Sequence, residues 1–169
     1  MKGTFRLAVL PTIAPYLLPR FFQQLSEKHT DLDIRMLEMK TAPTMAALQN
    51  GEIDAAIIAN QPTESNLQGD ILYYEQFFGY VAHNESIFKK DLIRTADIND
   101  ERLWLLDEGH CFRDQLMRFC QMEKVKVRQA AYRLGSLETF MRMVESGNGI
   151  TFIPGANTTS TPYSKISLP

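Results

Sequence analysis

The sequence predicts an α/β fold made of two lobes, and three observations lead to this expectation. Apolar residues occupy both faces of the first stretch, Thr4–Leu10, as in a strand that is covered by helices on each side. Strand-like and helix-like periods then alternate along residues 4–59, which is the order of a parallel, doubly wound sheet. A polar stretch that contains Pro62 interrupts this order, and strand and helix patterns resume after it. We therefore expect a boundary between lobes near Tyr74–Gln76.

The first lobe, residues 1–75, has the clearest periodicity. Pro15 or Pro19 is suited to the first turn of a helix, in which apolar residues recur at helical spacing from Leu18 to Leu25. Gly51 is a usual residue at the end of a helix. The other expected elements are a strand over Leu32–Met39, a helix over Thr41–Asn50 and a short buried strand over Asp54–Ala59.

The second lobe, residues 76–169, is expected to repeat the α/β arrangement. Ser136 is suited to cap a helix whose apolar face contains Leu137, Phe140, Met141 and Val144. A further helix is predicted over Cys111–Gln121. The expected strands of this half, including one at the boundary, are Ile71–Tyr74, Phe77–His83, Leu103–Leu106, Ala130–Arg133, Ile150–Ile153 and Lys165–Leu168.

Composition and charge exclude several classes of function. The chain has 169 residues, of which 44% are hydrophobic and 22% are charged, and its net charge is −2. Because Lys and Arg are scattered, we do not expect these residues to bind nucleic acid directly. No apolar run approaches the roughly 20 residues of a membrane span, and the N-terminus lacks the layout of a secretion signal. We expect a cytoplasmic protein without a cofactor.

The two cysteines, Cys111 and Cys120, are nine residues apart. This spacing fits neither a C-x-x-C redox motif nor a zinc site, and the chain has three histidines. Nine helical residues place two Cα atoms about 13 Å apart and their side chains on opposite faces. A disulfide needs Cα atoms within roughly 7 Å. The two thiols therefore cannot join while a helix spans them.

Two interpretations of the cysteine pair remain open on residue types alone. In the first, joining the sulfurs is a switch that melts the helix. Cys111 then suits a reactive thiol, because His110, Arg113 and a helix N-terminus would stabilise its thiolate. Cys120, in apolar company, suits a resolving thiol. In the second interpretation both cysteines are buried apolar residues, His110 is a cap residue and Arg113 is a solvated charge.

The segment GHCFRDQLMRFC, residues 109–120, resembles the redox segment of the OxyR peroxide sensors within the LysR-type transcriptional regulators. The family pattern G-H-C-x-R-D-Q-x-x-x-F-C is matched at every specified position. LPTIAPYLLP (10–19), LQNGEIDAAI (48–57) and GSLETFMRMVESGNGITFIP (135–154) also resemble successive parts of the LysR effector domain. The resemblance implies two Rossmann-like lobes of periplasmic-binding-protein type II architecture.

The same resemblance implies roles for individual residues. Cys111 corresponds to the cysteine that reacts with peroxide, and Cys120 to the one that resolves it into a disulfide. The expected peroxide pocket consists of Thr12, Thr41, His110, Arg113 and Asp114, with no metal. Thr12 and Thr41 also stand where a hydroxyl simply caps a helix.

The resemblance further implies a non-enzymatic sensor with several partners. The expected partners are hydrogen peroxide, RNA polymerase, thiol reductants such as glutaredoxin or thioredoxin, and a second copy of the chain. The copies would form a homodimer, and in the full-length protein a tetramer. Promoter DNA would be bound only by a winged helix-turn-helix domain, which we expect to lie outside this sequence. We also expect the segment that returns to the first lobe to lie outside it. Two other functions remain open: an effector domain that binds an organic inducer between its lobes, and a thiol peroxidase that uses Cys111.

Overall fold

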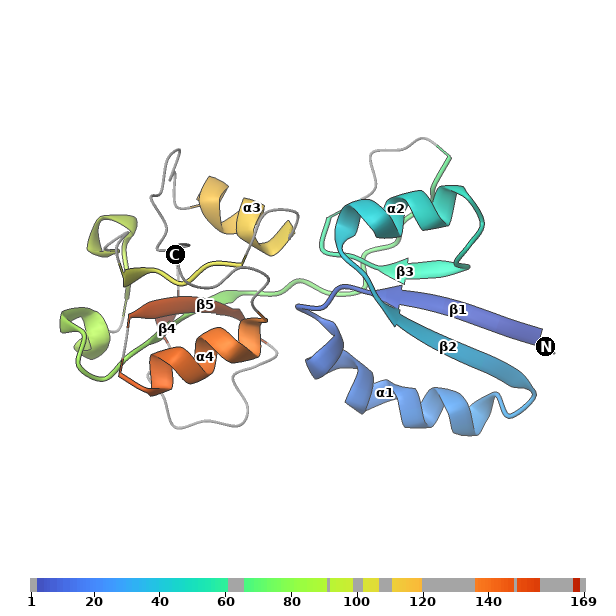
Figure 1. Cartoon of the computed structure of the whole chain (residues 1–169), viewed down its shortest axis with the longest axis horizontal. Helices are drawn as coiled ribbons and strands as arrows, with labels where there is room; N and C mark the ends of the chain where they lie inside the picture. Colours follow the sequence, from blue (N-terminus) through green and yellow to red (C-terminus); the bar gives the residue numbers. More distant parts are fainter. Residues whose placement is uncertain are drawn as a thin grey trace. The chain divides into compact units, whose positions relative to one another are not determined.

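The computed structural model describes residues 3–60, 66–90, 92–98, 102–106, 111–119, 136–147, 149–155 and 166–167. The chain divides into two compact units (Figure 1). Unit 1 comprises residues 1–73 and 109–111, and unit 2 comprises residues 74–108 and 112–169. In the described residues, each unit contains one three-stranded sheet.

The sheet of unit 1 is parallel, as the sequence predicts. It contains β1 (Gly3–Val9), β2 (Leu32–Glu38) and β3 (Ala55–Ile57) in the order β2-β1-β3. Leu7 lies opposite Met36 of β2 and Ala55 of β3. Two helices, α1 (Ala14–Lys28) and α2 (Thr41–Gln49), connect these strands. Pro15 lies in the first turn of α1, whereas Pro19 lies inside the helix.

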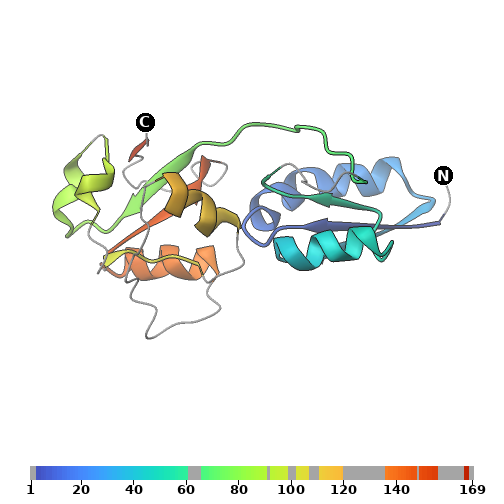
Figure 2. The ribbon, with the colours of Figure 1, turned by 90° about the horizontal axis from the view of Figure 1, so that it is seen from above.

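The two helices of unit 1 lie on opposite faces of its sheet (Figures 1 and 2). Leu7 and Val9 of β1 pack with Ala14 at the start of α1. Ala8, between them in the chain, points to the other face and packs with Ala47 of α2 and with Ile53. Because successive side chains of a strand alternate between faces, β1 is buried on both sides. The expectation of a strand covered by helices on each face is confirmed.

The sheet of unit 2 is antiparallel. Its strands are β4 (Phe77–Val81), β5 (Ile150–Pro154) and β6 (Ile166–Ser167), in the order β5-β4-β6. Two short 3-10 turns, Ser86–Lys89 and Thr95–Asp97, follow β4. The helices of the unit are α3 (Cys111–Phe119) and α4 (Leu137–Glu145). Ser136 caps α4 by accepting a hydrogen bond from the backbone N–H of Thr139, as predicted.

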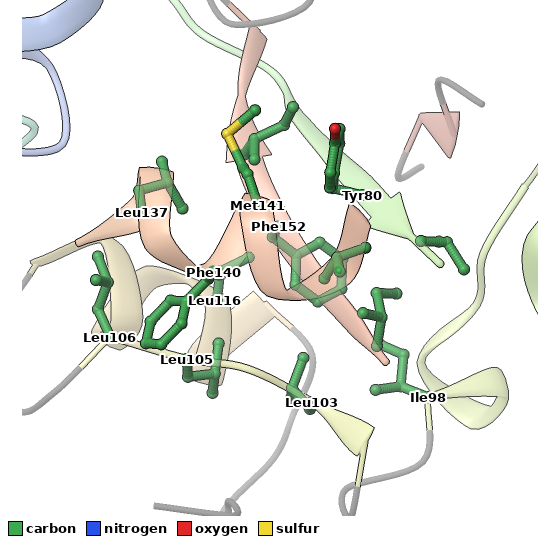
Figure 3. Packing of buried hydrophobic residues seen from close by; sticks show 14 of the residues in the cluster. Tyr80, Ile98, Leu103, Leu105, Leu106, Leu116, Leu137, Phe140, Met141 and Phe152 are labelled. Carbon is green, nitrogen blue, oxygen red and sulfur yellow. The ribbon is translucent and has the colours of Figure 1, made fainter. Parts of the chain in front are cut away.

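One apolar core joins these elements of unit 2 (Figure 3). Leu116 of α3, Phe140 of α4 and Phe152 of β5 are each at most 2% exposed. Phe140 also stacks on Trp104, with ring centroids 6.1 Å apart. The core therefore holds α3 and α4 to the sheet through side chains that the helical period of the sequence identifies.

A polar network lies beside this core. The hydroxyl of Tyr80 donates a hydrogen bond to Glu145 at 2.8 Å, and Arg142 pairs with both Glu145 and Glu138. Burial raises the pKa of the Glu145 carboxyl, but the hydrogen bonds from Tyr80 and Arg142 outweigh it, so the net pKa lies below the usual 4.5. This network ties the end of α4 to β4.

The structure contradicts two of the predicted strands. Ile71–Tyr74 is extended but pairs with no strand among the described residues, and its four side chains are exposed. Leu103–Leu106 is buried as predicted, yet it makes only one parallel bridge, from Leu103 to Ile150. Apolar residues alone do not make a strand, because a strand also needs a neighbouring strand in register. The strand predicted over Ala130–Arg133 lies outside the described residues.

The turn before β5 depends on a close approach of two backbones. Gly149 has a φ of +79°, and a Cβ atom there would lie 2.2 Å from the carbonyl oxygen of Arg102. Its backbone N–H donates to Glu85, which also accepts a hydrogen bond from Arg102 at 2.8 Å. Gly147 also has a positive φ, +93°, but only the ends of the His83 and Asn84 side chains lie near it, at 3.5 Å or more.

We predict that Gly149→Ala lowers the free energy of unfolding by about 3 kcal/mol or more, because it combines backbone strain with overlap. The matched variant Gly147→Ala should cost only the strain, about 1–2 kcal/mol. Urea unfolding of both variants measures the difference. Equal losses would contradict the close approach between Gly149 and Arg102.

Candidate functional site

Cys111 is the first residue of α3. Its side chain is a thiol, and it is 7% exposed. The first backbone N–H groups of a helix have no partner within the helix, and they carry a partial positive charge. The positive end of the helix favours a thiolate at this position, whereas burial of the side chain opposes it.

The helix that begins at Cys111 is held in place by its next residues. Phe112 and Leu116, one helical turn apart, are buried in the core of unit 2. The ring of Phe112 meets that of Phe77 edge to face, with centroids 5.2 Å apart and an interplanar angle of 85°. The helix therefore packs on the first residue of β4.

The charged residues of the first turn have different environments. Arg113 is partly buried, and its Nη1 donates a hydrogen bond to the carbonyl oxygen of Leu106 at 3.3 Å. This bond joins α3 to the buried segment Leu103–Leu106. Asp114 is exposed. The structure thus gives Arg113 a contact that the sequence does not predict, because the two bonded groups are seven residues apart across the start of a helix.

Thr12 and Thr41 lie after the carboxyl ends of β1 and β2. In a doubly wound sheet with helices on both faces, ligands bind beyond these strand ends, near the point where the strand order reverses. In the order β2-β1-β3 this point lies at β1. Thr12 lies in the turn after β1, which ends at Val9, and is buried. Thr41 is the first residue of α2. Both threonines therefore stand where this sheet type holds ligands.

Neither threonine caps its helix. The cap residue of α1 is Ile13 and that of α2 is Lys40, and neither cap makes a side-chain hydrogen bond. Within the part of the chain that the structure describes, the Oγ1 atom of Thr41 is buried and has no hydrogen-bond partner. Buried hydroxyls are normally paired, so an unpaired one needs an explanation. The capping alternative for both residues is wrong.

The division of the chain into units groups Cys111 with Thr12 and Thr41 in unit 1 and assigns Arg113 and Asp114 to unit 2. His110 and Cys120, the other predicted site residues, lie outside the described residues. Phe77 is the residue that sequence reasoning missed. Its contact with Phe112 spans 35 positions, and no local pattern predicts such a pair.

The described ranges contain neither a candidate metal site nor a candidate membrane span. They contain no group of three His, Cys, Asp or Glu residues that would hold a metal ion. No helix among them has the length and apolar character needed to cross a membrane.

Comparisons with known proteins identify the family of this chain. Residues 1–158 match the family described as LysR substrate binding domain. The chain is 33% identical over 154 residues to a "Probable hydrogen peroxide-inducible genes activator" of Mycobacterium leprae, covering 91% of this chain and 50% of that protein. The chain thus spans about half the length of the curated relatives it matches.

Two solved structures are similar over most of their length. An OxyR mutant from Porphyromonas gingivalis has 52% identity and a TM-score of 0.88, with 96% of this chain and 74% of that chain covered. The reduced OxyR regulatory domain from Pseudomonas aeruginosa has 30% identity and a TM-score of 0.83, with 99% and 82% covered. The chain therefore belongs to the LysR substrate-binding-domain family, with the two-lobed α/β fold of that family, and within it is similar to OxyR regulatory domains.

Proposed function

We propose that this domain senses hydrogen peroxide for a transcription activator and is switched by a disulfide between Cys111 and Cys120. The observation that carries the proposal is the segment GHCFRDQLMRFC in a domain 52% identical to an OxyR, with the thiol of Cys111 buried at a helix start. Both features concern the same residue, Cys111.

The chemistry that we propose has two steps. The Cys111 thiolate attacks one oxygen of hydrogen peroxide, the O–O bond breaks, and the other oxygen leaves as hydroxide, which leaves a sulfenic acid on Cys111. The Cys120 thiol then displaces that hydroxyl as water and forms the disulfide. A thiol reductant such as glutaredoxin or thioredoxin returns two electrons and two protons. The reductant leaves as its own disulfide, and the cycle as a whole reduces peroxide to water. We propose that the output of the domain is its changed shape in the disulfide state rather than this consumption of peroxide.

The helix makes the second step a conformational switch. α3 has nine helical residues from Cys111 to Phe119, and Cys120 follows directly in the sequence. Because a helix of this length separates its ends by about 13 Å, the disulfide forms only after α3 unwinds. The surface of unit 2 then changes. We propose that this change alters the packing of a homodimer, and in the full-length protein of a tetramer, and so the contacts with promoter DNA and RNA polymerase.

The peroxide pocket that we propose consists of Thr12, Thr41, His110, Arg113 and Asp114. The support for Thr41 is its buried Oγ1 atom, which has no partner among the described residues. A peroxide molecule has two O–H donors and oxygen acceptors, so it would satisfy such a hydroxyl. This would orient the peroxide near a helix N-terminus, where the developing hydroxide is stabilised.

We predict that brief treatment with substoichiometric peroxide places the first sulfenic acid on Cys111. A carbon nucleophile that traps sulfenic acids, followed by mass mapping, locates it. Cys111→Ser should abolish trapping, whereas Cys120→Ser should retain it. Trapping mainly on Cys120 in the unmodified protein would overturn the proposed function.

Thr41 and Thr44 of α2 offer a matched test of the pocket. Thr44 Oγ1 donates to the carbonyl of Lys40 at 2.8 Å, so Thr44→Val should lower the free energy of unfolding by about 1–2 kcal/mol. Thr41→Val removes a hydroxyl without a partner, so stability should be unchanged or higher. We expect the rate of Cys111 oxidation to fall roughly tenfold in Thr41→Val, as for the loss of one hydrogen bond in the transition state. Stopped-flow oxidation and urea unfolding give the two readouts, and an unchanged rate would exclude Thr41 from the pocket.

Replacement of Cys120 should separate sensing from switching. In Cys120→Ser, peroxide still oxidises Cys111, but no disulfide holds α3 unwound, and Phe112 and Leu116 keep the helix packed. We expect limited proteolysis around Gln115–Phe119 to increase strongly in the oxidised unmodified protein and little in oxidised Cys120→Ser. An equal increase in both would mean that the sulfenic acid alone drives the change.

A further inference from the structure

We propose that the aromatic contact between Phe77 and Phe112 sets the midpoint potential of the Cys111–Cys120 couple. The inference rests on the proposed disulfide switch. It adds the residues that set the equilibrium between the dithiol and the disulfide state. Phe77 and Phe112 are positioning residues, because neither ring takes part in the chemistry.

The contact fastens the first turn of α3 to the sheet of unit 2. Phe112 directly follows Cys111 and is 4% exposed. Its ring meets Phe77 at a centroid distance of 5.2 Å and an interplanar angle of 85°, an edge-to-face geometry that stabilises beyond simple burial. Phe77 is the first residue of β4 and lies opposite Pro154 of β5. The partner of Phe112 is thus part of a hydrogen-bonded ladder.

The switch must break this contact. Phe112 lies between the two cysteines in the sequence, and the disulfide requires the helix over this segment to unwind. The bond from Arg113 to the carbonyl of Leu106 ties the same turn to the core and resists the same movement. An interaction that exists in only one of two states shifts their equilibrium by its full free energy. The Phe77–Phe112 contact therefore stabilises the dithiol state against the disulfide state.

The equilibrium in question is a balanced thiol–disulfide exchange. Glutathione disulfide accepts two electrons and two protons from the thiols of Cys111 and Cys120 and becomes two glutathione molecules. Its S–S bond breaks as the Cys111–Cys120 bond forms. Weakening the dithiol state alone raises the equilibrium constant for disulfide formation, which makes the midpoint potential more negative.

Phe140 provides a matched control in the same core. It is 2% exposed and stacks on Trp104 with centroids 6.1 Å apart. Phe140 lies on α4, outside the 111–120 segment. Its contact should persist in both redox states, so its loss should destabilise both states equally.

The test is redox titration of the intact protein in glutathione buffers, with the disulfide fraction read by thiol alkylation and mass spectrometry. Phe112→Leu and Phe77→Leu should each raise the equilibrium constant for the Cys111–Cys120 disulfide roughly 3- to 10-fold, the worth of an edge-to-face aromatic pair. A tenfold change corresponds to a midpoint potential about 30 mV more negative. Phe140→Leu should leave the potential unchanged.

Melting temperatures of the two redox forms provide the second readout. Phe112→Leu and Phe77→Leu should lower the melting temperature of the dithiol form and leave that of the disulfide form unchanged. Phe140→Leu should lower both. The double variant Phe77→Leu/Phe112→Leu should shift the potential by less than the sum of the single shifts, because both remove one contact.

The outcomes separate the two proposals. If the unmodified protein forms no Cys111–Cys120 disulfide with peroxide, the proposed function fails and this inference fails with it. If the disulfide forms but neither the Phe77 nor the Phe112 variant shifts the potential, only the inference fails. An equal shift in Phe140→Leu would also overturn it, since the effect would then belong to the core as a whole. Should Phe112→Leu not fold, Phe77→Leu tests the same contact from β4.

Discussion

The helix α3 depends on the apolar core of unit 2. α3 has nine helical residues, and a helix this short is not stable by itself in water. Its stability comes from tertiary packing, mainly from Phe112 and Leu116. The free energy that keeps α3 folded is therefore mainly that of burying one apolar face. In the proposed switch, joining the sulfurs of Cys111 and Cys120 would act directly against that burial.

This dependence gives the two units different roles. Unit 1 is a parallel sheet covered on both faces, and Thr12 and Thr41 follow the ends of its strands β1 and β2. Unit 2 packs α3 against its apolar core. Its sheet is antiparallel, and it is tied to α3 through the Phe77 ring and the carbonyl of Leu106. A short helix whose stability depends on one apolar face suits the proposed switch, since switching needs two states of similar free energy.

Local patterns predicted the elements with strong periodicity. The helix α2 was predicted at nearly its observed bounds, as were the Ser136 cap of α4 and the parallel sheet of unit 1. A helix was also predicted where α1 lies, and of the two prolines proposed to open it, Pro15 lies in the first turn. The predictions were wrong where strand pairing was inferred from apolar content alone. Ile71–Tyr74 is apolar but exposed, and Leu103–Leu106 is buried but makes one bridge. In both stretches the residues favour a strand, but only a neighbour in register makes one.

The sequence by itself determined the features that depend on nearby residues. These are the start of α3 at Cys111, the spacing of nine to Cys120, and the helical period that buries Phe112 and Leu116. Only the tertiary structure decided which distant groups meet. It paired Phe77 with Phe112, bonded Arg113 to Leu106, and left the Thr41 hydroxyl buried without a partner in the described chain. The reason is that periodicity records which face of an element is buried, whereas the partner on that face depends on how separate elements pack.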